Sequence, residues 1–477
     1  MATASKVIGV LVLSLFGDRI ATYDDPTTYR MSSVNITTLG QTQEYRLGQL
    51  LWQTYFNHTS LSYLGDPSPI SALVASGAVR FDADMGGQGH VIYDSAVALS
   101  QGMWPPVNIR DVPSITLANG STIKSPLGGF RFTSINQIHP WDDVSLEGWL
   151  ECPNFETAMQ SFYSSSGFRQ VEKDNEEFLS SLSYWVGNRS TSLSDIKNLY
   201  DYLSIRYIHD AAFSSVLPSG VLNKARQLAS YHESGVYTST DLNSTHNVPG
   251  RALLPKILNA IEGIANKSNP LKFYSMSLSH QPLMSLLSMM GVSESYANLT
   301  GLFSQAGSIA LEVRTDNDGE NPFIQFLLKN GTSDPHYSGY ALFGGSPDIS
   351  VSKFESMLQP FGLSTLSSWC GLCGTHITRG CGSTRASNNA DLSSVAAGLM
   401  GAGATLFVAL MLVTLCVMVG LLKVGEWGKR LGAVIVAPMQ HSRKGSNVKS
   451  GGEQSENDDE VRLARKWEDD QGNASAG

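Results

Sequence analysis

The sequence predicts an α/β domain with a helical insertion, followed by one transmembrane helix near the C-terminus. The run VIGVLVLSLF at 7–16 is apolar at nearly every position, which is typical of a strand covered on both faces of a parallel sheet. The order strand, loop, helix then occurs twice along the chain. Residues 395–422 carry no charge, and this segment is longer than the ~20 residues that a helix needs to cross a bilayer.

The two strand–helix units define where a ligand should bind. After the strand at 7–16, apolar side chains recur at helical spacing over 40–56. The segment 271–280 is predicted to be a second strand, ending at His280 and running into an apolar helix that Gly291 stops. In open α/β sheets, ligands bind beyond the carboxyl ends of strands. We therefore expect the site at the ends of these two strands.

A helical insertion is predicted between the two units, over about 110–267. Its segment 155–267 reads as mostly helical, with Ser192 as an N-cap. The segment 251–267 is a further helix, in which Pro255 is tolerable only in the first turn.

The last part of the ectodomain is predicted to add a hairpin and a short helix. The segments SIALEVRTD and NPFIQFLLKNGT read as strands joined by a turn at 317–319. Ser352 and Glu355 have the spacing of a capping box, which would open a helix that ends before Gly362.

Charges around the apolar segment predict its orientation. Several lysines and arginines follow the segment directly, and such an excess marks the cytosolic side. The N-terminal domain is then extracellular or lumenal, at the plasma membrane, on the cell-wall side or in a vacuole. The predicted parts are the ectodomain 6–381, a stalk at 382–394, the transmembrane helix 395–422 and a disordered cytosolic tail at 423–477.

Glycosylation motifs and cysteines agree with that orientation. Sequons of the form Asn-x-Ser/Thr precede the apolar segment at Asn35, Asn57, Asn119, Asn188, Asn243, Asn266, Asn298 and Asn330. Cys152, Cys370, Cys373 and Cys381 lie on the same side, which suggests two disulfides with three alternative pairings. A zinc site is the rival interpretation, because His376 lies among the last three of these cysteines.

Two further features bound the interpretation. The first residues offer Lys6 and a short apolar run but no convincing cleavage site, so we expect the true signal sequence to be missing from this sequence. A net charge of -9 over 477 residues argues against a nucleic-acid-binding surface.

Seven segments carry a family resemblance, and they follow one order along 6–381. They are KVIGVLVLSLFGDRIA, TTLGQTQEYRLGQLL, DSAVALSQGMWPP, LECPNFE, DYLSIRYIHD, SHQPLMSLLSMMGV and SSWCGLCG. In this order the chain resembles the histidine acid phosphatases, in the branch that includes phytases, and especially the membrane-anchored fungal members. The first segment is similar to the strand and nucleophile loop with the signature Arg-His-Gly-x-Arg-x-Pro. The sixth lies where the family carries its His-Asp pair.

This resemblance implies a fold and a chemistry. The fold has three layers, with a mixed, mainly parallel sheet between helices and a helical cap domain. In the family reaction a histidine nitrogen attacks the phosphoryl group, arginines hold its oxygens, and an acid protonates the leaving alcohol. The sequence has no metal or nucleotide motif, so we expect no cofactor.

Three positions of that chemistry are altered here. Leu15 stands where the first phosphate-binding arginine belongs, Phe16 stands at the nucleophile position, and Gln281 replaces the acidic proton donor. A phenyl ring has no lone pair to attack phosphorus, and an amide cannot supply the proton. Arg19 and His280 remain as residual phosphate-site residues.

Each surviving residue also has a plainer interpretation. Arg19 could form an ion pair with Asp18 or another carboxylate, and His280 could be a hydrogen-bonded histidine at a strand end. The family's distal arginine belongs near 78–94, where Arg80 is the arginine available.

The sequence therefore predicts a membrane-anchored glycoprotein with a histidine acid phosphatase fold and without catalysis, a pseudo-phosphatase that acts by binding. Its partners would be the membrane and a phosphate-containing or other small ligand in the vestigial cleft, with any protein partner left open. The alternative is a phosphomonoester hydrolase with weak or unconventional activity, which the retained Arg19 and His280 would support.

Overall fold

The computed structural model forms two compact units, residues 1–391 and 392–477. It describes residues 5–22, 27, 29, 33–65, 77–88, 90–105, 114–125, 127, 130–296, 299–316, 320–382, 405, 409–412 and 414–415. The predicted stalk beyond Gly382, the cytosolic tail and most of the predicted transmembrane segment lie outside these residues. Among the helices that are described, none is both long and apolar enough to cross a membrane.

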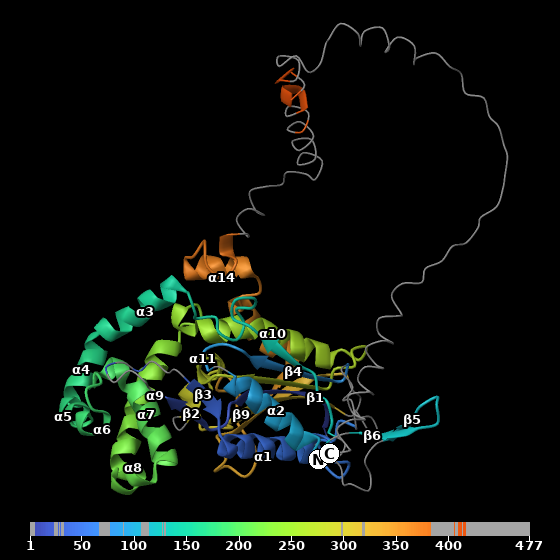
Figure 1. Cartoon of the computed structure of the whole chain (residues 1–477), viewed down its shortest axis with the longest axis horizontal. Coiled ribbons are helices and arrows are strands. Elements are labelled where there is room, and N and C mark those ends of the chain that lie inside the picture. The colour runs from blue at the N-terminus through green and yellow to red at the C-terminus, as the bar shows by residue number, and fades with distance from the viewer. Residues whose placement is uncertain are drawn as a thin grey trace, which may run out of the picture. The chain divides into compact units, whose positions relative to one another are not determined.

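A central sheet organises the first unit (Figure 1). Its strand order is β11-β10-β9-β1-β8-β4-β7, with β12 beside β10. The strands are β1 (Lys6–Leu15), β4 (Val79–Asp84), β7 (Ile135–Ile138), β8 (Phe273–Leu278), β9 (Ser308–Thr315), β10 (Phe323–Lys329), β11 (Ser338–Gly339) and β12 (Asp348–Ser350). Two small hairpins lie outside it, β2 (Arg19–Thr22) with β3 (Ser33–Ile36) and β5 (Ser114–Thr116) with β6 (Thr122–Lys124).

The sheet is mixed, and the expectation of a mainly parallel sheet is wrong. Strands β1, β8, β4 and β7 are parallel neighbours, whereas β1, β9, β10, β11 and β12 pair antiparallel. The reason lies in the predicted hairpin. Because β9 and β10 are joined by a short connection, they can only pair antiparallel, and β9 joins the sheet beside β1 in the reverse direction.

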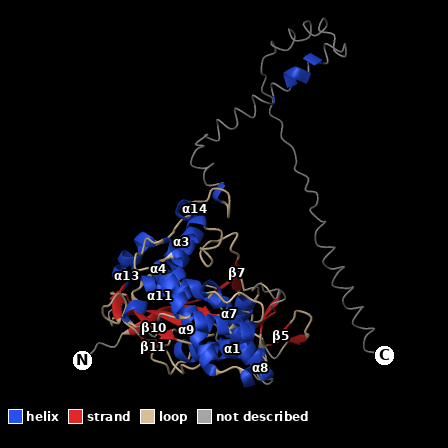
Figure 2. Cartoon of the chain, turned by 90° about the vertical axis from the view of Figure 1, so that its left-hand side faces the viewer, coloured by secondary structure: helices blue, strands red, loops and turns tan. Residues whose placement is uncertain are grey.

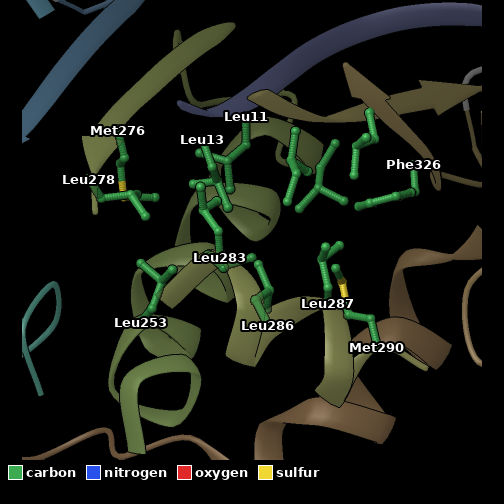
Figure 3. Close-up of a cluster of buried hydrophobic side chains, with 14 of the residues drawn as sticks. Leu11, Leu13, Leu253, Met276, Leu278, Leu283, Leu286, Leu287, Met290 and Phe326 are labelled. Atoms are coloured by element: carbon green, nitrogen blue, oxygen red, sulfur yellow. The ribbon is translucent and has the colours of Figure 1, made fainter. Parts of the chain in front are cut away.

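Helices cover both faces of the sheet, which confirms a layered α/β fold. Helices α1 (Thr38–Tyr55) and α2 (Val91–Met103) cover one face, where Val10 and Val12 of β1 pack with Leu51 and Leu99. Helices α10 (Val248–Ala265) and α11 (His280–Met289) cover the other. There, Leu11 and Leu13 of β1 point toward apolar residues of these two helices (Figure 3).

This double coverage explains the unbroken apolar sequence of β1. Alternate side chains point to opposite faces of a sheet, and both faces here are buried under helices. Each fully buried aliphatic side chain contributes ~1.5–3 kcal/mol relative to an exposed one. The predicted strand at 7–16 and the predicted helix at 40–56 are therefore both confirmed.

The predicted helical insertion begins later than expected. Residues 114–138 carry β5, β6 and β7 rather than helices, and β7 belongs to the main sheet. The helical part consists of α3 (Pro153–Ser164), α4 (Ser166–Asp174), α5 (Glu176–Ser181), α6 (Ser183–Val186), α7 (Ile196–His209), α8 (Ala211–Val216) and α9 (Ser219–Tyr237), with short 3-10 turns at Leu193–Asp195 and Thr245–Asn247. Helix α7 packs extensively on α9 (Figure 2). The buried apolar side chains of this helical part form a cluster of their own.

Helix α10 shows how an interior proline is accommodated. Contrary to expectation, the helix begins at Val248, so Pro255 lies in its interior and not in its first turn. Proline has no N–H to donate to the carbonyl four residues earlier, which belongs to Arg251. That carbonyl instead accepts a hydrogen bond of 3.0 Å from the N–H of Leu363. The bond that proline removes is thus replaced by a distant segment.

The predicted cap of helix α13 (Val351–Leu358) is also displaced. The N-cap is Ser350 and not Ser352, because the Ser350 hydroxyl accepts from the N–H of Lys353. Starting the helix there buries both Val351 and Phe354 against the core. The short helix α12 (Val292–Ser295) follows α11 across Gly291, which has φ of 70° as expected of a helix-stopping glycine.

The first unit contains two disulfides, as predicted. They join Cys152 to Cys373 and Cys370 to Cys381, with the last three cysteines in or beside helix α14 (Leu366–Cys373). A 3-10 turn at Gln359–Phe361 precedes this helix. Because all four thiols are oxidised, no thiolate is left to bind metal, and the zinc interpretation is wrong.

Candidate functional site

The carboxyl ends of β1 and β8 lie side by side, as the sequence predicts. These strands pair in parallel, with Leu15 opposite Leu278. Phe16 directly follows β1, and His280 begins α11 two residues after the end of β8. A cavity of about 220 Å³ opens there, and its lining includes Leu15, Phe16, Arg19 and His280. The structure therefore brings four of the predicted site residues together.

Phe16 follows β1 directly, where the family resemblance expects the nucleophile, and its surroundings fix its place. Its side chain is 7% exposed, and its carbonyl accepts a hydrogen bond from the N–H of Ala306. The next residue, Gly17, passes so close to α1 that a Cβ there would lie 2.5 Å from the carbonyl oxygen of Gly40. Only glycine fits this contact, so the turn that presents Phe16 to the cavity has little freedom.

Arg19 is engaged in an ion pair, as its plainer interpretation supposed. Its guanidinium donates to both carboxylate oxygens of Asp201 at 3.1 and 2.9 Å, and its side chain is 4% exposed. The guanidinium carbon lies 5.7 Å from the centre of the Phe16 ring. The partner is Asp201 of α7 rather than the neighbouring Asp18, whose carboxylate contacts His209 at 2.8 Å. Much of the positive charge of Arg19 is thus neutralised within the protein.

His280 belongs to a buried hydrogen-bonded chain. Its Nε2 lies 2.5 Å from one carboxylate oxygen of Glu233, and the other oxygen of Glu233 lies 2.9 Å from Nδ1 of His232. Nε2 of His232 in turn lies 2.8 Å from the Tyr163 hydroxyl. These hydrogen bonds link Tyr163 in the helical part to His280 at the cavity.

The electrostatics of that chain favour a charged carboxylate. Although burial alone would raise the pKa of Glu233, the hydrogen bonds from His232 and His280 hold it well below its usual value. Burial lowers the pKa of His280, and the contact with Glu233 offsets only part of this effect. A carboxylate fixed to the imidazole can orient His280 but occupies its Nε2.

Gln281 does not line the cavity. It follows His280 on α11, and its side-chain oxygen is buried without a hydrogen-bond partner among the described residues. Its amide group bonds toward Tyr237 of α9 instead. No carboxylic acid stands at the position of the family's proton donor.

Arg80 lies away from the site, and its assignment as a distal phosphate-binding residue is wrong. It pairs in register with Tyr274, four residues before β8 ends, and at ~3.3 Å per residue this is about 13 Å below the cavity. Its side chain is half-exposed, donates to both oxygens of Asp82 and stacks on the Tyr274 ring at 4.7 Å. These contacts account for its charge.

The residue at the carboxyl end of β4 is an acid and not an arginine. Asp84 and Glu147 are both buried, and each accepts a hydrogen bond from a backbone N–H, of Gly86 and Gly87 respectively. Burial, and then repulsion from Glu147, raises the pKa of Asp84. Two carboxyl groups at this position add no positive charge that could bind a phosphate.

Three charged residues of the cavity were missed by sequence reasoning: Lys197 and Asp201 of α7, and Arg226 of α9. A signal was present, because Lys197, Asp201 and Ser204 recur at helical spacing on one face of α7. The sequence prediction used only the apolar face of that helix.

The sequons are mostly accessible. Asn298 lies outside the described residues, and Asn57 and Asn330 are half-buried. The oxygen of Asn330 also accepts from the N–H of Ser304, which makes it a poor acceptor for a glycan. The exposed sequon asparagines are Asn35, Asn119, Asn188, Asn243 and Asn266.

Comparison with known proteins agrees with the resemblance seen in the sequence. No family model matches the chain. Prostatic acid phosphatase of Bos taurus is 21% identical over 332 residues, which is 68% of this chain and 76% of that protein. This match supports the resemblance of the chain to the histidine acid phosphatases, and the ordered motifs around β1 and β8 agree with it.

Solved structures with similar folds are phytases and an inositol polyphosphate phosphatase. The phytase of Citrobacter braakii has a TM-score of 0.48 at 12% identity, covering 75% of this chain and 98% of that one. The Hafnia alvei phytase, solved with myo-inositol hexakis sulphate, has 0.49 at 12%, covering 75% and 98%. The multiple inositol polyphosphate phosphatase of Bifidobacterium longum has 0.45 at 12%, covering 76% and 94%. With TM-scores below 0.5, these likenesses add nothing to the family assignment.

Proposed function

We propose that this chain is a non-catalytic member of the histidine acid phosphatase family, a pseudo-phosphatase whose cleft binds a ligand without turning it over. The observation that carries the proposal is Phe16, a buried phenyl ring at the end of β1 where an imidazole would have to attack phosphorus. Loss of a nucleophile typically abolishes the covalent route and leaves only weak residual catalysis from binding groups.

The surviving polar groups support the same conclusion. Arg19 is paired with Asp201, Leu15 is apolar, and Nε2 of His280 is bound to Glu233. The cavity therefore lacks an unoccupied arginine on β1 and its following loop. Charge-assisted hydrogen bonds to a phosphoryl group from that loop would require breaking an existing ion pair.

The second candidate function is a phosphomonoesterase with an unconventional site. The specific observation in its favour is the His280–Glu233 pair, since an imidazole oriented by a buried carboxylate is a common device for proton transfer. Its nucleophile would then have to be something other than residue 16.

Turnover of p-nitrophenyl phosphate at pH 5 by the purified full-length chain separates the two candidates. We expect no turnover above background. Robust turnover that disappears in His280→Ala would overturn the non-catalytic proposal. The triple variant Leu15→Arg, Phe16→His, Gln281→Asp should gain activity, with Leu15→Arg, Gln281→Asp as the matched control that still lacks a nucleophile.

We also propose that the chain is a membrane-anchored glycoprotein with a lumenal or extracellular ectodomain. The uncharged segment 395–422, the basic residues after it, the two disulfides and the exposed sequons support this proposal. Resistance to alkaline carbonate extraction, lost when 395–422 is deleted, is the expected result. Glycosidase treatment should increase mobility on a gel, and an unchanged mobility would refute the glycoprotein assignment.

A further inference from the structure

The cavity at the end of β1 has an excess of positive charge. Its cationic lining residues are Arg19, Lys197 and Arg226, and Asp201 is the acidic residue that lines it. Asp201 is already paired with Arg19 at 2.9 Å. The contacts of Arg226 are uncharged, namely a backbone carbonyl at 3.0 Å and a serine hydroxyl at 3.1 Å. Among the lining residues the charges of Lys197 and Arg226 therefore have no acidic partner, and the nearby negative charge is that of Glu233, which is bonded to His280 and does not line the cavity.

Lys197 is the more informative of the two. Its side chain is half-buried on α7, and it has no hydrogen-bond or ion-pair partner in the part of the chain that the structure describes. Its charge contributes to lowering the pKa of both Glu233 and His280, although other groups have larger effects. A partly desolvated ammonium gains stability from an anion that is brought to it.

The uncharged lining is part polar, with Gln88, Ser204, Ser304 and Gln305, and part apolar. Leu15, Phe16, Ile205, Leu302 and Phe303 all line the cavity, and each is at least nine-tenths buried. Hydrocarbon surface of this extent does not replace the water around a small, fully hydrated dianion, but it does stabilise an apolar group. The cavity measures about 220 Å³, and a cavity of about 150 Å³ is enough to hold a benzene ring.

We infer that the cavity binds a small amphiphilic organic anion, in which Lys197 and Arg226 hold one oxyanion group and the Phe16 side of the cavity holds an apolar body about the size of one ring. The inference rests on the proposed non-catalytic function, because the same substitutions that remove the nucleophile create the apolar wall. The ligand class thus shifts from a hydrated phosphate ester toward an anion with a hydrocarbon body.

Isothermal titration calorimetry on the full-length chain in lipid nanodiscs tests this inference. There are three probes. Phenylphosphonate carries both an oxyanion group and a ring, inorganic phosphate carries only the charge, and benzyl alcohol carries only the ring. Phenylphosphonate should bind at least tenfold more tightly than either of the others. Lys197→Met should weaken the binding of phenylphosphonate at least fivefold and leave the affinity for benzyl alcohol unchanged.

Two variants serve as controls for position and for the apolar wall. Lys224→Met removes a half-buried lysine of α9 that does not line the cavity, and it should leave all three affinities unchanged. Phe16→Ala should weaken the binding of phenylphosphonate several-fold more than it weakens the binding of inorganic phosphate. Binding of phosphate as tight as that of phenylphosphonate, or equal effects of the Lys197 and Lys224 variants, would overturn the inference.

The result is independent of the catalytic test, because a phosphonate has a carbon–phosphorus bond that phosphatases do not hydrolyse. Absence of both turnover and phenylphosphonate binding would sink this inference and leave the non-catalytic proposal standing. Turnover of p-nitrophenyl phosphate together with the expected binding pattern would sink only the non-catalytic proposal.

Discussion

The two disulfides close loops of very different length, and this difference gives a quantitative prediction. Cys152–Cys373 spans 221 residues and Cys370–Cys381 spans 11. A disulfide stabilises mainly by restricting the unfolded chain, so the longer loop gains more. The chain-entropy relation gives about 5 kcal/mol for the long loop and about 3 kcal/mol for the short one.

The perturbation is removal of one bridge at a time by paired alanine substitutions. Alanine is preferred to serine because all four sulfur atoms are in buried residues, where a hydroxyl would need a partner. Unfolding by urea, followed by tryptophan fluorescence, measures the free energy of unfolding. We expect Cys152→Ala, Cys373→Ala to lose about 2.5 kcal/mol more than Cys370→Ala, Cys381→Ala.

A control and a contrary result complete this prediction. Cys416→Ala removes the remaining cysteine and should leave the free energy of unfolding unchanged. Equal losses for the two paired variants, or a larger loss for Cys370 and Cys381, would show that restriction of the unfolded chain is not what these bridges contribute.

Three further predictions follow from buried groups. Burial raises the pKa of Glu44 well above its usual value, so folding favours its protonated form, and the free energy of unfolding should fall as the pH rises above about 4. Urea unfolding of Glu44→Gln at several pH values should show a weaker dependence of this free energy on pH. An unchanged pH dependence would refute the raised pKa of Glu44. Pro255→Ala should raise the free energy of unfolding by far less than the ~3 kcal/mol that an interior proline usually costs, because the Arg251 carbonyl already accepts a hydrogen bond from Leu363. An increase near 3 kcal/mol in the same assay would contradict this expectation. Glu233→Gln should move the NMR titration midpoint of His280 to lower pH, since the carboxylate partly offsets the effect of burial; an upward shift would refute this.

The parts of the fold that local sequence determines were predicted correctly. The strand β1 is identifiable because its side chains from Val10 onward are buried on both faces of the sheet, and α1 because one face of it is apolar. The sheet's direction pattern was not predictable in the same way, because it depends on where the β9–β10 hairpin docks. The start of the helical part was misplaced for a related reason, since β7 is a short, largely exposed strand that owes its place to β4.

In the site, too, some neighbours follow from the local sequence and others depend on how distant elements pack. Phe16 and His280 meet because they follow adjacent parallel strands, and this follows from sequence order. The partner of Arg19 is Asp201, which is far away in the chain and reaches the cavity only through the packing of α7. Arg80 was misassigned because its distance from the strand end depends on register, which a single sequence does not reveal.

The cross-linked corner around α14 has a mechanical consequence. The chain leaves the ectodomain just after Cys381, which is bonded to Cys370, and Cys373 in the same helix is bonded to Cys152. If the chain is anchored in a membrane as proposed, tension on the segment after Cys381 would reach the start of α3 through covalent bonds, and α14 could not unfold one hydrogen bond at a time. The two disulfides would then spread such a force over the whole first unit.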